Sequence, residues 1–258
     1  METLLKLLSV ASGQYLLLIS LSFILAGAVK GAIGLGLPTV AVGTLSLLMT
    51  PMEAAALLIV PSFFTNIWQL AAGPDVSGLL RRLWPMLLGV CAGTFAGALV
   101  LPHVQAGGAV ARLGLGLALA VYALMGLGSV HWSVTAEVER RLAPLIGAIT
   151  GVVTAATGVF MLPAVPFLQA LGLDKDELVQ AMGLAFTVST VALALNLAYA
   201  GAFQWSGAGT SLFALLPALI GMQLGQWLRK RMDALLFRRC FFAGLLLLGS
   251  HFIWEFLR

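Results

Sequence analysis

The stretch GAVKGAIGLGLPTV, Gly27 to Val40, interrupts a long apolar run with glycines and then a proline, and it carries a lysine, Lys30, inside that run. A weaker copy, GVVTAATGVFMLPAV, Gly151 to Val165, interrupts a second long apolar run and has Thr154 at the place that corresponds to Lys30. Glycine disfavours a helix interior, and proline lacks the N–H that helical hydrogen bonding requires. Both stretches therefore predict broken helices.

The composition of the chain indicates a membrane protein. Of 258 residues, 60% are hydrophobic and only 9% are charged, whereas soluble domains carry about 25% charged residues. The 29 glycines are typical of closely packed transmembrane helices. The net charge of +4 lies in short loops, so it indicates membrane orientation and argues against a nucleic-acid partner. The sequence predicts an all-α polytopic membrane protein.

Eight segments approach or exceed the length of about 20 apolar residues that a transmembrane helix needs. The connections between them are too short for a soluble domain, so residues 1–258 are expected to form a single transmembrane domain. The segments are Gln14–Thr50, Ala54–Ala72, Leu83–Leu101, Ala109–Ser129, Leu142–Leu171, Leu178–Ala200, Ala208–Leu228 and Cys240–Leu257, and the first and fifth are the interrupted ones.

The two halves of the chain repeat, over about 14–129 and 142–257. A constant offset of 124 relates the two broken stretches, and an offset of 132 relates the segments that follow. Seven matches in the same order make a duplication a better explanation than chance. The matched pairs are Gly27 with Gly151, Lys30 with Thr154, Gly34 with Gly158, Glu53 with Glu177, Pro85 with Pro217, Gly89 with Gly221, and Gly93 with Gly225.

The distribution of basic residues bears on the direction of the repeats. If each interrupted segment crosses the membrane once, the basic residues in loops divide seven to six between the two sides. If each turns back, they divide ten to three, which the positive-inside rule favours. We therefore expect two inverted repeats, each with a broken re-entrant or hairpin helix pair plus three transmembrane helices, and both termini away from the cytoplasm. This architecture is typical of transporters.

The two breaks predict an anion-binding centre. Non-helical backbone at membrane depth is tolerated where it lines a polar cavity. A proline suits the first turn of a new helix, whose free N–H groups attract anions. Lys30 would add a charge, and Asn66 and Thr190, which correspond at offset 124, would add polar groups at one depth. The expected substrate-binding residues are Lys30, Gly34, Gly36, Pro38, Thr39, Asn66, Thr154, Thr157, Gly158 and Thr190.

Each of these residues also has a structural interpretation. The glycines could serve helix packing, Lys30 could extend to the membrane interface, and the polar groups could form interhelical hydrogen bonds. Thr50 with Glu53, and Asp174 with Glu177, have the spacing of helix capping boxes, although gating or proton relay stays open for both glutamates. No spacing suits a metal site, a cofactor or catalysis, so the chain is not expected to be an enzyme.

The sequence VKGAIGLGLP, Val29 to Pro38, together with TAATGVFMLP, Thr154 to Pro163, resembles the TauE/SafE family of sulfite and organosulfonate exporters, also called the toluenesulfonate-uptake permease family. The likeness covers nearly the whole chain. It implies a multi-pass permease of the bacterial inner membrane that moves small sulfur-containing anions or related carboxylates.

The function expected from both arguments is secondary transport of a small oxyanion such as sulfite or a sulfonate. The anion would bind between the two breaks, with alternating access from rocking of the halves. A passive anion channel is the first alternative, and a membrane accessory subunit is a weaker one. The choice of anion, import or export, a proton or sodium as coupling ion, and a homo-oligomeric state are all left open by the sequence.

Overall fold

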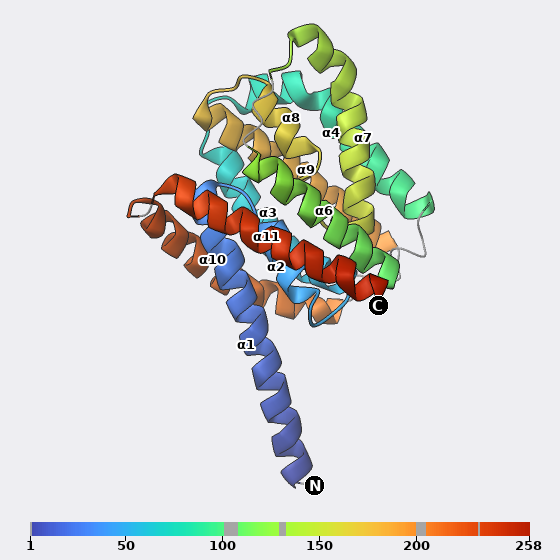
Figure 1. Ribbon diagram of the computed structural model, residues 1–258, viewed down its shortest axis with the longest axis vertical. Coiled ribbons are helices and arrows are strands. Elements are labelled where there is room, and N and C mark those ends of the chain that lie inside the picture. The colour runs from blue at the N-terminus through green and yellow to red at the C-terminus, as the bar shows by residue number, and fades with distance from the viewer. Residues whose placement is uncertain (1, 101–107, 129–132, 200–204, 232) are drawn as a thin grey trace.

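A computed structural model describes residues 2–100, 108–128, 133–199, 205–231 and 233–258. In this part of the chain every regular element is a helix, which confirms the all-α fold (Figure 1). The helices are α1 (Glu2–Ile33), α2 (Leu37–Leu45), α3 (Pro51–Ala71), α4 (Val76–Val100), α6 (Ala109–Leu127), α7 (Ala136–Thr157), α8 (Ala164–Ala170), α9 (Lys175–Tyr199), α10 (Trp205–Arg229) and α11 (Ala234–Leu257).

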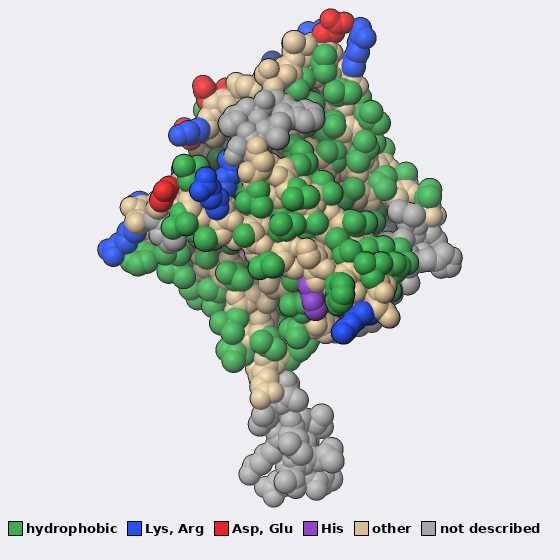
Figure 2. All heavy atoms as spheres, in the orientation of Figure 1, with side chains coloured by type: hydrophobic (Ala, Val, Ile, Leu, Met, Phe, Trp, Pro, Cys, Tyr) green, Lys and Arg blue, Asp and Glu red, His purple; other side chains and the backbone are tan. Residues whose placement is uncertain are grey.

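Seven helical segments of the described residues are long and apolar enough to cross a membrane, which confirms a multi-pass membrane protein. They lie in α1, α3, α4, α6, α9, α10 and α11. Helix α7 is not among them, and its first turns carry four charged residues. Figure 2 shows a broad hydrophobic face with charged side chains gathered mainly along its upper and left edges. The segment ends predicted at Leu101, Ser129 and Ala200 lie outside the described residues.

The helices are interrupted at both predicted stretches. Helix α1 ends at Ile33 and α2 begins at Leu37, while α7 ends at Thr157 and α8 begins at Ala164. Gly34, Gly36 and Gly158 have φ values of 84°, 104° and 72°, a left-handed conformation that costs other residues strain. Pro38 lies in the first turn of α2, as expected, and Pro163 directly precedes α8.

Two helix pairs pack through glycines, α1 with α10 and α4 with α7. A Cβ atom at Gly27 would overlap the carbonyl of Ala218, and one at Gly147 would overlap the carbonyl of Met86. One turn later, Gly31 meets Met222 and Gly151 meets Val90 in the same way. Because the residue numbers rise together, the helices of each pair run parallel. Glycine lets their backbones touch, as small residues do in membrane helix pairs.

Two further pairs run antiparallel. Gln69, near the end of α3, donates to the carbonyl of Val179 near the start of α9 at 3.1 Å, while Ser62, earlier in α3, lies 3.3 Å from Thr190 of α9. In the second pair, Arg112 near the start of α6 bonds Glu255 near the end of α11 at 2.8 Å. Tyr122, later in α6, stacks edge-on against Phe242, earlier in α11.

Helix α3 lies at the centre of the bundle, against α2, α9 and α10. Pro61 in its middle lacks an N–H, so the carbonyl one turn earlier, at Leu57, has no helical donor. The hydroxyl of Ser211 in α10 supplies that hydrogen bond at 2.9 Å. The proline that would weaken α3 in isolation therefore fastens it to a neighbouring helix.

A matched pair of glycine substitutions tests the helix contacts. Gly147→Ala places a methyl group on the backbone of α4 and should lower the free energy of unfolding by about 1–3 kcal/mol. Gly244→Ala, in α11, meets no atom within 4 Å and should raise stability by a few tenths to about 1 kcal/mol, because alanine favours helices. Thermal unfolding in detergent measures both. Equal changes in the two variants would contradict the packing described.

Candidate functional site

Lys30 lies near the end of α1 and is 4% exposed. Its ammonium Nζ donates to the hydroxyl of Thr65 at 3.1 Å and to the side-chain carbonyl of Asn66, both on α3. An ammonium group has three donors, so these two partners leave one for a further acceptor. The side chain points into the bundle, and the structure thus rejects the alternative in which Lys30 extends to the membrane interface.

Other buried polar groups continue from Asn66 to α9. The Asn66 amide donates to the hydroxyl of Ser62 at 3.0 Å and to that of Thr190 at 3.4 Å. Asn66 and Thr190, predicted to lie at one depth, are therefore in contact. We call Lys30, Ser62, Thr65, Asn66 and Thr190 the Lys30 cluster; all five residues are buried.

The Lys30 cluster contains one basic side chain and no acidic side chain. In the described residues the ion pairs join Arg82 to Glu139, Arg112 to Glu255 and Arg141 to Glu137, so no carboxylate lies within ion-pair distance of Lys30. Burying a charge away from water is costly unless it is paired, and an ionisable side chain at membrane depth marks a functional site by default. The cluster is therefore suited to bind an anion.

The hydroxyls of the second break bond to their own helix instead. Thr154 donates to the carbonyl of Thr150 and Thr157 to that of Val153, each at 2.7 Å. Gly158 packs directly against Ala55 of α3. None of these groups is bonded to a member of the Lys30 cluster.

The two breaks lie at different levels along α3. The carbonyl of Gly34 accepts a hydrogen bond from Gln69 at 2.9 Å, whereas Gly158 lies against Ala55. The fourteen residues between Ala55 and Gln69 correspond to roughly 21 Å of helix. The breaks themselves are therefore not face to face as expected. The two segments make contact where the hydroxyl of Thr39, in the first turn of α2, donates to the sulfur of Met161, which lies within the second break.

Sequence reasoning omitted two residues of α3 that organise this region, Ser62 and Thr65, whereas it included Gln69 among the polar groups that could surround an oxyanion. Ser62 and Thr65 complete the Lys30 cluster, and Gln69 joins the first break to α9 through Gly34 and Val179. The signal was present, because polar residues three and four positions apart share one face of a helix. A polar stripe on an otherwise apolar helix is the pattern that could have identified them.

The two acidic capping motifs differ in their outcome. At α3 the capping box is complete: Glu53 accepts from the N–H of Thr50 at 2.8 Å, and the Thr50 hydroxyl accepts from the N–H of Glu53 at 3.3 Å. At α9 only Glu177 contributes, accepting from the N–H of Asp174 at 3.2 Å. Both glutamates thus have a role at a helix start.

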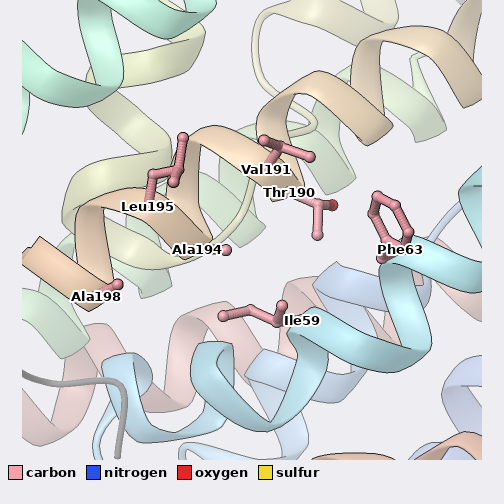
Figure 3. A pocket seen from close by; sticks show the side chains of 7 residues that line it. All are labelled: Ile59, Phe63, Thr190, Val191, Ala194, Leu195 and Ala198. Carbon is pink, nitrogen blue, oxygen red and sulfur yellow. The ribbon is translucent and has the colours of Figure 1, made fainter.

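A groove of about 350 Å³ between α3 and α9 borders the Lys30 cluster (Figure 3). In Figure 3, Phe63 of α3 lies near Thr190 and Val191 of α9, and Ile59 of α3 lies opposite Ala194; Thr190 is the one polar residue in the lining. Since the Thr190 hydroxyl also contacts Ser62 and Asn66, the polar cluster reaches the edge of this apolar groove.

One family of known proteins matches this chain. The family model described as Sulfite exporter TauE/SafE matches residues 19–252. The chain belongs to the TauE/SafE family. No curated protein and no solved structure gave a match.

Membership of the TauE/SafE family makes the chain a membrane transport protein of the sulfite exporter class. The match spans both breaks and every helix that contributes to the Lys30 cluster. The transporter class agrees with the prediction that the chain is not an enzyme. No group of three or more residues able to hold a metal ion occurs among the residues that the structure describes.

Replacing Lys30 tests whether its charge serves function or stability. Lys30→Met keeps most of the side-chain volume and removes the desolvated charge, so the substrate-free protein should unfold at a temperature equal to or above that of wild type. Lys175→Met, at the exposed start of α9, serves as the control and should change little. Thermal unfolding without added anions gives the answer; a large loss of stability confined to Lys30→Met would assign Lys30 a structural role.

Proposed function

We propose that the chain is a secondary transporter for small sulfur-containing oxyanions such as sulfite or organosulfonates, and that the anion binds at the Lys30 cluster. The observation that carries this proposal is the buried amino group of Lys30, which has two neutral hydrogen-bond acceptors and, in the part of the chain that the structure describes, no carboxylate partner. A bound oxyanion would supply the missing negative charge. The TauE/SafE membership supports the choice of a sulfur oxyanion.

The oxyanion replaces the Asn66 carbonyl as acceptor for Lys30. An oxygen of sulfite or of a sulfonate accepts from the ammonium group at the strength of a charge-assisted hydrogen bond. The Asn66 amide and the Ser62 hydroxyl donate to the remaining oxygens, and the Thr190 hydroxyl does so once it leaves the carbonyl of Phe186, to which it now donates at 2.7 Å. These neutral donors orient the anion without burying further charges.

The residues at the two breaks form the walls that move during transport. Gly34 and Gly36 hold the first break in a conformation that needs glycine, and Gly158 does so for the second. Pro38 and Thr39 lie in the first turn of α2, and Thr39 contacts Met161 of the second break. Thr154 and Thr157 join the anion's surroundings only when their hydroxyls leave the α7 carbonyls they now bond. Helix α8, with seven residues, contributes little dipole of its own.

The helix directions support inverted repeats with hairpin breaks. If α7 and α8 formed a single crossing, α9 would be the fourth crossing after α3, and the two would run parallel. Their contacts run antiparallel, as they do if α7 and α8 are two opposing legs. Likewise, α11 would be the fourth crossing after α6 and parallel to it if α7 and α8 formed a single crossing, but α6 and α11 are antiparallel. The parallel contact of α1 with α10 then requires that α1 and α2 also oppose one another.

The helix partners support the same symmetry. In the two repeats, α1 is equivalent to α7 and α4 is equivalent to α10. The contact of α1 with α10 is therefore equivalent to the contact of α7 with α4. Gly34 of the first break faces Val179 of α9, and Gly158 of the second faces Ala55 of α3, which is the same contact at offset 124. Two structurally equivalent halves around one site are the basis of alternating access. The arginine-rich ends of α4 and α7 would face the cytoplasm of a bacterial inner membrane.

Cysteine labelling tests this topology. The hairpin arrangement places the turn before α4 and the α10–α11 turn on the same side of the membrane, whereas single crossings place them on opposite sides. In a chain whose native Cys91 and Cys240 are replaced by serine, Ser77→Cys and Lys230→Cys should react with a membrane-impermeant thiol reagent from the same side. Arg258→Cys should react from the other side. Labelling of the first two from opposite sides would exclude the inverted repeat.

Counterflow in proteoliposomes tests the transport function. Unlabelled sulfite inside the vesicles should accelerate uptake of radiolabelled sulfite by wild type, and Lys30→Met should abolish uptake while Lys175→Met retains it. Flux without acceleration would indicate the passive channel, and imposed proton or sodium gradients would identify the coupling ion. If neither sulfite nor a sulfonate moves, the substrate class is wrong.

Ligand stabilisation provides an independent measure. A ligand at 100 times its dissociation constant raises the free energy of unfolding by about 2.7 kcal/mol. Sulfite or a sulfonate should raise the unfolding temperature of wild type, whereas chloride should not. Lys30→Met should show no such increase with any of these anions.

A further inference from the structure

A second pocket, remote from the Lys30 cluster, lies where α4 and α7 begin. Its volume is about 560 Å³, and it is lined by Arg81, Arg82 and Trp84 of α4 and by Glu139 and Arg140 of α7. The two helices approach closely about one turn further along, where Met86 meets Gly147. The pocket therefore lies between the first turns of α4 and α7, before the two helices come into close contact.

The charge of this pocket is positive after its internal pairing is counted. Glu139 accepts from Arg82 through both oxygens, at 2.7 and 2.8 Å, so these two charges cancel. Arg81 and Arg140 remain, one on each helix, and among the described residues neither has a carboxylate within ion-pair distance. The nearby Asp75 carboxylate accepts from the N–H of Gly78 and the hydroxyl of Ser77, and these bonds, with a smaller contribution from the charge of Arg81, lower the pKa of Asp75.

The surroundings of the pocket are those of a membrane interface. Trp84 is 55% exposed, and tryptophan is enriched at the level of lipid headgroups. Along the same two helices, toward the bilayer, Leu88, Leu145 and Ile149 are exposed apolar side chains. A soluble anion would use only the arginines, whereas a phospholipid would use the arginines, the tryptophan and this apolar surface together.

We propose that this pocket binds the headgroup of an anionic phospholipid, with its acyl chains along the exposed apolar side chains of α4 and α7. The phosphate bridges Arg81 and Arg140 and so joins the two helices at the end where Arg82 and Glu139 already pair. Arg82 also donates to the carbonyl of Leu171 at 3.2 Å, which brings the end of α8 into the same assembly. Basic pockets between membrane helices on the cytoplasmic side are typical sites for such headgroups.

Lipid titration of the delipidated full-length protein tests the proposal. Short-chain phosphatidylglycerol should raise the unfolding temperature of wild type well above the effect of phosphatidylcholine of the same chain length. The double variant Arg81→Gln/Arg140→Gln should bind phosphatidylglycerol about thirtyfold more weakly, which is ~2 kcal/mol for two arginines at 1.4 kcal/mol per tenfold change. The matched control is Arg141→Gln/Lys175→Gln, which removes two exposed charges outside the pocket and should keep the wild-type response.

Three results would overturn the proposal. If both double variants bound phosphatidylglycerol equally weakly, the lipid would be attracted by the net charge of the protein and not by the pocket. Equal stabilisation by glycerol phosphate would mean a site for soluble oxyanions, and no preference for phosphatidylglycerol would mean no headgroup site. Unfolding of each variant in phosphatidylcholine alone verifies that it is folded. Because Lys30 is intact in every protein, sulfite binding measured in parallel separates failure here from failure of the proposed function.

Discussion

Contact between helix backbones at glycines is the constraint on which the rest of the bundle depends. Lipid offers apolar side chains no advantage in meeting one another, so membrane helices associate through close packing and hydrogen bonds. Gly27 and Gly31 bring α1 onto α10, and Gly147 and Gly151 bring α7 onto α4. These two parallel pairs flank the antiparallel pair α3 and α9, which carries most of the Lys30 cluster between them.

The glycine contacts also fix how far each broken helix extends. Gly27 and Gly31 of α1 contact α10 at positions that correspond, in the repeat, to the positions of α4 that Gly147 and Gly151 contact. By these contacts, α1 and α7 are offset by 120 residues rather than by 124. The breaks nevertheless correspond at 124, through Gly34 and Gly158. Helix α7 therefore continues one turn further past its crossing than α1 does. That extra turn contributes to the asymmetry of the two halves, in which Lys30 reaches α3 while Thr154 bonds its own helix.

Lys30 is buried among polar side chains that carry no charge. Its partners, Thr65 and Asn66, are neutral. Asn66 in turn donates hydrogen bonds to Ser62 and Thr190. Neutral donors and acceptors can reorganise around an arriving anion without leaving a second charge unpaired. The arginines where α4 and α7 begin differ from Lys30, because Glu139 neutralises Arg82, while Arg81 and Arg140 form no ion pair among the described residues.

The sequence by itself determined the membrane class and the two helix breaks, and it singled out Lys30 and the correspondence of Asn66 with Thr190. These follow from local chemistry: the scarcity of charge, the conformations that only glycine adopts easily, and the cost of a lysine within an apolar run. Only the tertiary structure decided that Lys30 bonds Thr65 and Asn66, that Thr154 and Thr157 bond their own helix, and that the breaks lie at different levels of α3. The reason is that a repeat offset gives the order of residues along each half, whereas the depth at which helices meet is set by backbone contacts between residues far apart in the chain.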